Sequence, residues 1–139
     1  MNVEMTEVLL VFGFSWVLVG CFLGLIQGVK HTQHHATLDQ YAKSDDLLAY
    51  HQELISFKQK TTAHTHTMLF PVVVILIALS MPLNGYAGDH PAILVIGLIV
   101  ATVIWTIGGV LNLKPLKGIG DLLLIVSIMV TIEGLAKGL

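Results

Sequence analysis

Residues 92–112, AILVIGLIVATVIWTIGGVLN, form the stretch of sequence that decides the fold of this chain. The stretch contains no charged side chain. It is long enough to cross the hydrocarbon core of a bilayer, which takes about 20 predominantly apolar residues in a helix. A short connection, Asn84–Pro91, precedes it, and lysines follow it from Lys114 onward. The pattern predicts a membrane-spanning helix over Ala92–Asn112.

Three further segments have the same character, namely Val8–Gly28, Thr67–Leu83 and Ile119–Ala136. The chain has 139 residues, of which 55% are hydrophobic, and its mean hydropathy is +0.82. These values are typical of a polytopic membrane protein and not of a soluble domain. We therefore expect an all-α fold in which one membrane domain, residues 1–139, forms a four-helix bundle. The lipid bilayer is the first expected partner.

The lysines predict how the bundle is oriented. The chain has no arginine, and six of its seven lysines lie in the first connection, residues 29–66, or in the third, between the last two spans. By the positive-inside rule, these connections are expected in the cytoplasm and both termini outside. Seven lysines against nine acidic residues, on a hydrophobic body, give no basic surface for nucleic acid.

The second half of the first connection has the pattern of an amphipathic helix. Ser44 is a suitable N-cap, and apolar residues follow at helical spacing in Leu47, Leu48, Leu54 and Ile55. His51 falls on that apolar stripe and is expected to face the membrane or the bundle. We expect this helix to lie on the membrane surface or over the mouth of the bundle. Because no Gly or Pro occurs between Lys30 and Phe70, it could also run continuously into the second span.

Six of the seven histidines lie in or beside this polar connection, so chemistry is expected there. On a helix, His31, His34 and His35 would share one arc of roughly 100°. His31 and His35 have the i, i+4 spacing that lets two imidazoles reach one metal ion. His64 and His66 would diverge by about 200°, so only one of them can face a given iron.

The remaining histidine, His90, is expected to be an ordinary loop residue. The candidate metal ligands are His31, His34, His35, His64 and His66. Copper, zinc and non-haem iron all accept imidazole, so the ligand type does not identify the metal.

Glycines at Gly20, Gly24 and Gly28 form a GxxxGxxxG stripe on the first span. Such a stripe allows close approach of another helix or of a flat ligand.

Three short motifs carry a resemblance to a known family. Ala63-His64 opens the second span, Trp105 to Asn112 closes the third, and Gly118-Ile119-Gly120-Asp121 begins the fourth. With these motifs, its length and its four spans, the chain resembles the small membrane haem proteins typified by styrene oxide isomerase. The resemblance implies a trimeric bundle that binds ferric haem b through His64, with the iron acting as a Lewis acid on an epoxide oxygen.

The chain also departs from this family. There, a tyrosine and an aspartate of the third span shape the substrate pocket, whereas this third span offers Thr102, Trp105, Thr106 and Asn112. The resemblance therefore supports haem binding more than it supports isomerisation. The candidate cofactor-binding residues are His64, His66, His51 and Trp105.

Two classes of function follow. In the first, the protein binds haem b through His64 or His66. An open sixth position would then suit Lewis-acid chemistry, and a second histidine, His31, His35 or His51, would suit electron transfer. In the second class, the chain is a non-catalytic subunit of a larger membrane complex, with histidines that bind a metal or line an interface. A proton or ion pathway is a third option. In either main class, the glycine-striped bundle is expected to assemble further, as a homo-oligomer or in a larger complex.

Overall fold

A computed structural model describes residues 3–85 and 90–138 of the chain. Its elements, in chain order, are α1 (Val3–Lys43), α2 (Leu47–Ser80), a short 3-10 helix η1 (Met81–Leu83), α3 (His90–Val110) and α4 (Lys114–Gly138). The described part contains no strand, and all four α-helices are long and apolar enough to span a membrane. The predicted all-α four-helix bundle is thereby confirmed.

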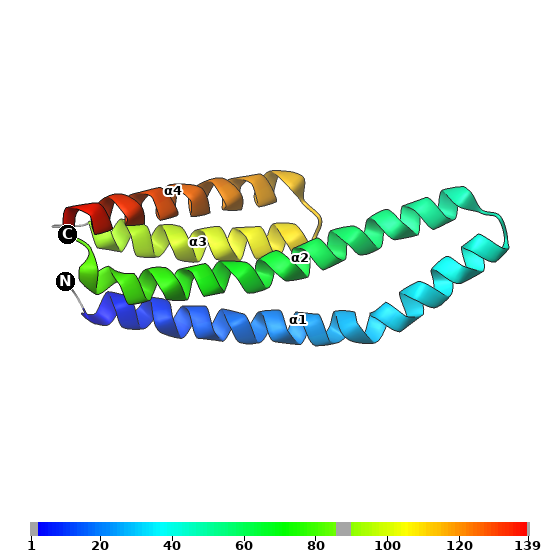
Figure 1. The fold of residues 1–139 in the computed structure, drawn as a ribbon, viewed down its shortest axis with the longest axis horizontal. Coiled ribbons are helices and arrows are strands. Elements are labelled where there is room, and N and C mark those ends of the chain that lie inside the picture. Colours follow the sequence, from blue (N-terminus) through cyan, green and yellow to red (C-terminus); the bar gives the residue numbers. More distant parts are fainter. Residues whose placement is uncertain (1–2, 86–89, 139) are drawn as a thin grey trace.

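The four helices differ in length, and the difference shapes the molecule. At 1.5 Å per residue, α3 and α4 are about 30 Å and 37 Å long, which matches the hydrocarbon core of about 30 Å. By the same measure α1 and α2 are about 60 Å and 50 Å long. Figure 1 shows the consequence: α1 and α2 continue side by side well beyond the ends of α3 and α4. We call this extension the hairpin arm. It consists of α1 after Gly28, the turn 44–46 and α2 before Thr67.

The arm corrects two expectations for the first connection and confirms the alternative that its second helix runs continuously into the second span. No separate amphipathic helix lies on the membrane surface, because that segment is the first part of α2 and continues into the second span without a break. The N-cap is Asp46 and not Ser44. The Asp46 side chain accepts a hydrogen bond of 3.0 Å from the backbone N–H of Ala49, whereas the Ser44 hydroxyl donates to the carbonyl of Tyr41 at the end of α1.

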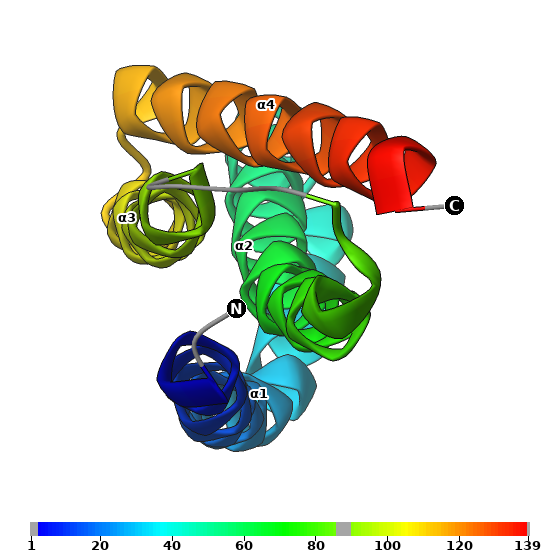
Figure 2. The ribbon, with the colours of Figure 1, turned by 90° about the vertical axis from the view of Figure 1, so that its left-hand side faces the viewer.

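The core of the bundle is built around α2. Viewed along the bundle in Figure 2, α2 occupies the middle, with α1 and α4 on opposite sides and α3 beside it. The buried apolar side chains come from all four helices and include Leu9, Phe70, Val74, Ile77, Leu94, Leu98, Trp105 and Leu124. Large apolar side chains also cover the outer surface, for example Val11, Phe14, Leu18 and Phe22 of α1. An apolar surface of this kind is suited to lipid and not to water.

Small residues bring α1 and α2 close together. A Cβ atom built at Gly13 would lie 2.6 Å from Ile75, and one built at Gly24 would lie 2.5 Å from the ring of His64. A Cβ at Gly28 would meet nothing within 4 Å. The first two glycines of the predicted stripe, Gly20 and Gly24, therefore serve close packing of helix on helix, and the third does not.

The two ends of the bundle are distinct. α1 begins and α4 ends at the same end of the bundle in Figure 1, and the backbone N–H of Gly85 donates to the carbonyl of Gly134 across 2.9 Å at that end. The opposite end carries the arm and the turn between α3 and α4. Six of the seven lysines lie on that side, since only Lys137 lies at the end where α1 begins and α4 ends.

Candidate functional site

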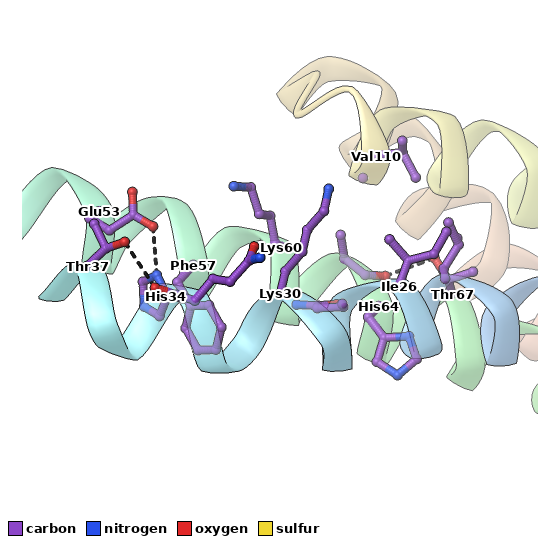
Figure 3. Close-up of a pocket in the computed structure, with 15 residues that line it drawn as sticks. Ile26, Lys30, His34, Thr37, Glu53, Phe57, Lys60, His64, Thr67 and Val110 are labelled. Atoms are coloured by element: carbon purple, nitrogen blue, oxygen red, sulfur yellow. Dashed lines mark hydrogen bonds and ion pairs between the residues drawn. The ribbon is translucent and has the colours of Figure 1, made fainter.

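A pocket lies where the hairpin arm joins the bundle. It has a volume of about 390 Å³ and is bounded by α1, α2 and the last turn of α3 (Figure 3). Apolar lining comes from Leu23, Ile26 and Val110, and Gly109 adds backbone. This volume is within the range of small-molecule sites, which is roughly 300–1,000 Å³.

The part of the pocket toward the arm is polar. Its lining there includes Lys30, His34, Glu53 and Lys60. Figure 3 shows the side chains of Lys30 and Lys60 extending to the same side of the two helices. Neither lysine has an ion-pair partner among the described residues. One end of the pocket is therefore apolar and the other is cationic.

His64 also lines the pocket, and Figure 3 shows its ring on the opposite side of the two helices from the ends of Lys30 and Lys60. Its ring is half-buried and rests on Gly24, where a side chain would collide with it. Its Nδ1 atom is buried and has no hydrogen-bond partner in the described part of the chain. A buried imidazole nitrogen without a partner is costly, by about 1–3 kcal/mol, and it marks a place where a ligand or a donor would be favourable.

His66 faces the other way, as the helical spacing predicts. Its ring stacks on Trp105 of α3, with centroids 4.6 Å apart and planes 12° apart. Its Nδ1 donates to the carbonyl of Thr62 across 3.0 Å. Trp105 is buried, and its indole nitrogen has no partner among the described residues. His66 and Trp105 thus form one packed pair on the α3 side of α2, away from the His64 ring.

His34 is the most buried of the described histidines, and its partners come from α2. Its Nδ1 lies 2.7 Å from a carboxylate oxygen of Glu53, which accepts the hydrogen bond. Its ring stacks on Phe57 with a centroid distance of 3.9 Å and an interplanar angle of 7°. The sequence patterns singled out neither Glu53 nor Phe57. The pairs Gly24–His64, Gln27–Thr61 and His31–Phe57 follow one antiparallel register of α1 and α2.

The other histidines of the arm are exposed. The Nε2 atoms of His31 and His35 lie 3.3 Å apart on the outer face of α1. His51 does not line the pocket, and its side chain is exposed, so the expectation that it packs against the bundle is wrong and the expectation that it faces the membrane stays a prediction. The expectation of packing failed because the face of α2 that packs on α1 carries Glu53 and Phe57, whereas Leu47 and Leu48 remain exposed. The side chain of His90 lies outside the described part of the structure.

The five candidate metal ligands do not converge. His64 and His66 lie on different faces of α2, His34 is paired with Glu53, and His31 with His35 forms a separate pair. Residues 3–85 and 90–138 contain no group of three or more His, Cys, Asp or Glu side chains that could hold a metal ion. A metal centre built from the whole histidine cluster is therefore not what this fold assembles.

The helices and their lengths define the class: the chain is an all-helical membrane protein with several spans. No protein-family model, no curated protein and no solved structure matches this chain. The pocket and the individual histidines are therefore the features of this chain that bear on its function.

Proposed function

We propose that this chain binds haem b at the junction of the bundle and the hairpin arm, with His64 as the axial ligand. The observation that carries the proposal is the His64 ring, which is held against Gly24 with a buried nitrogen that has no partner in the described chain. The ring is only half-buried.

The number of available ligands favours haem over a protein-only metal site. A structural zinc site takes four protein ligands and a catalytic one takes three. Haem brings four nitrogens of its own and requires only one or two protein ligands. The described residues contain no group of three side chains that could hold a bare metal ion. A single histidine such as His64 is therefore better suited to ligating haem.

The surroundings of His64 fit an amphipathic, anionic ligand. Leu23, Ile26 and Val110 provide apolar contact, and Lys30 and Lys60 are the cations that line the same pocket. Haem b has the same division between an apolar ring and carboxylate side chains. In this proposal His64 holds the iron, the apolar residues exclude water, and the two lysines stabilise the carboxylates.

The ligation state follows from the spacing along the helices. His31 is seven residues beyond Gly24 on α1, which corresponds to about 10 Å along the helix axis, and His35 and His51 are farther along the arm. His66 is engaged with Trp105 on the other face of α2. His34 lines the same pocket as His64, but its Nδ1 is engaged by Glu53 and its ring stacks on Phe57. Among the described histidines, none is therefore placed to share an iron with His64. When bound, the haem would supply a Lewis-acid iron with an exchangeable sixth position.

The orientation in the membrane is part of the proposal. With six of the seven lysines on the side of the arm, the positive-inside rule gives a cytoplasmic arm and pocket mouth, with both termini outside. The haem site would then lie at the cytoplasmic interface of the bilayer.

Absorption spectroscopy of the detergent-purified chain, reconstituted with ferric haem b, tests the proposal. We expect a Soret band, and b-type α and β bands after dithionite reduction. His64→Gly should lose this spectrum and regain a Soret band with free imidazole, which can replace a missing ligand but not a missing fold. His51→Ala is the matched control and should bind haem like the wild type. Equal spectra in His64→Gly and the wild type would contradict the proposal.

A further inference from the structure

A second site is visible on the outer face of the hairpin arm. His31 and His35 are both exposed, and their Nε2 atoms approach to 3.3 Å. Zinc binds imidazole nitrogen at about 2.0–2.1 Å in tetrahedral geometry, and two such ligands are then separated by roughly 3.3 Å. The two nitrogens therefore already have the separation that a shared ion requires.

We propose that His31 and His35 bind a divalent transition-metal ion such as Zn²⁺ as a two-nitrogen clamp. Imidazole suits zinc, copper and nickel alike, so the two ligands define only the class of ion. Which of these ions is bound depends on which one is available to the protein. No third described ligand converges on the pair, and water completes the coordination shell. A shell of this kind belongs to an exchangeable ion and not to a permanent structural one.

The rings are oriented by the neighbouring helix. Phe57 of α2 lies against both, with centroid distances of 5.4 Å to His31 and 6.2 Å to His35. Phe57 is itself held by its parallel stack on His34. The clamp is thus preorganised by contacts between α1 and α2 and is not simply a pair of histidines on an isolated helix.

His34 does not belong to the clamp, although it is the immediate neighbour of His35 in sequence. One of its ring nitrogens is engaged by Glu53, and the ring lies in the interface between the helices. The site is also separate from the haem site proposed above, because His64 does not contact either ring. Loss of one site should therefore leave the other intact.

Isothermal titration of the detergent-purified chain with ZnCl₂ tests this inference. We expect one ion per chain. His31→Gln or His35→Gln should lower the affinity by at least about tenfold, since loss of a mere supporting residue at metal sites already costs about 10–100-fold. His51→Gln removes another exposed histidine of the arm, and His64→Gly removes the proposed haem ligand. Both should bind zinc like the wild type.

A register control keeps the number of histidines constant. The double variant Gln33→His/His35→Gln has the same number of imidazoles, but at i, i+2 spacing, where they diverge by about 200° on the helix. It should lose the site. Unchanged zinc binding in this variant, or equal losses in His31→Gln and His51→Gln, would overturn the inference. As a control, the circular dichroism spectra of the variants should match that of the wild type, which would show that these exposed substitutions leave the helices intact.

Discussion

At the scale of single residues, Gly24 has the largest effect on the candidate site. It is the contact surface for the His64 ring, whereas a Cβ added at Gly28, one turn further along the same stripe, would meet nothing within 4 Å. The two glycines are equivalent in the sequence pattern, and only the approach of α2 distinguishes them. They therefore form a matched pair for mutation.

The substitution Gly24→Ala would place a methyl group 2.5 Å from the His64 ring, so the ring or the helix must move. Overpacking of this kind typically costs about 1–3 kcal/mol. In contrast, Gly28→Ala should be neutral or stabilising by about 0.5–1 kcal/mol, because alanine is favoured over glycine inside a helix. Thermal unfolding in detergent compares the two variants. Equal melting temperatures would show that α2 does not approach α1 at Gly24.

Individual residues also show what the sequence could and could not predict about the site. The divergence of His64 and His66 follows from helical geometry alone, and it is confirmed. The pairing of His34 with Glu53 depends on how α1 and α2 are aligned, which local patterns do not contain. The same long-range alignment decides that His51 is exposed. Haem and metal binding remain predictions.

At the scale of elements, the hairpin arm is the main difference from the sequence-based expectation. Polar composition in residues 29–66 suggested a connection with its own surface helix. Helix formation in this segment is nevertheless unbroken on both sides of the turn, because it contains no Gly or Pro between Lys30 and Phe70. The absence of Gly and Pro from this segment thus predicts its structure better than its polar composition does. The pair of buried His34 and half-buried Glu53 then joins the two helices within the arm.

The pair predicts a local stability effect in the arm. Glu53→Leu would leave the buried His34 without its acceptor, at a cost of about 1–3 kcal/mol. Hydrogen exchange of the backbone around both residues should accelerate by about tenfold or more, while exchange in α3 and α4 stays unchanged. Glu53→Gln retains an acceptor oxygen and should preserve most of the protection. The neighbouring exposed position provides the control, since Gln52→Leu should not accelerate exchange; if it did so equally, the pair would have no special role.

The turn of the arm gives a second prediction at this scale. Asp45 adopts φ 58°, in the left-handed region that glycine, asparagine and aspartate tolerate best. Asp45→Gly should therefore keep the stability of the arm, whereas Asp45→Val should lower it by roughly 1–2 kcal/mol. Limited proteolysis at the turn distinguishes these outcomes. Faster cleavage of the glycine variant than of the valine variant would contradict this conformation.

At the scale of the whole molecule, the length and placement of the apolar segments were sufficient to predict the bundle. Each expected span coincides with part of one helix, and the bounds of α3 and α4 differ from prediction by a few residues. The bounds of α1 and α2 differ far more, because hydropathy locates the membrane-embedded part of a helix and not its end. The sides of the membrane were predicted from lysines alone and require an experiment.

Cysteine labelling in oriented vesicles can determine these sides. Cys21 is the single cysteine and lies within the first span, so Cys21→Ala provides a background without thiols. On it, Ser44→Cys at the tip of the arm should react with an impermeant maleimide only from the cytoplasmic side. Glu4→Cys, an exposed position at the other end of the bundle, should react only from outside. The reverse pattern would invert the orientation, and labelling of both from one side would contradict the four-span topology.

The turn between α1 and α2 also has a consequence for how the chain assembles. Only three residues, 44–46, separate the two longest helices, so little chain entropy is lost when they pair. Their contacts join residues that are synthesised before α3 and α4 exist. The paired hairpin can therefore form first in the nascent chain and provide the surface on which α3 and α4 later dock. Mutations in the α1–α2 seam should then slow biogenesis, whereas mutations between α3 and α4 should mainly shorten the lifetime of the finished protein.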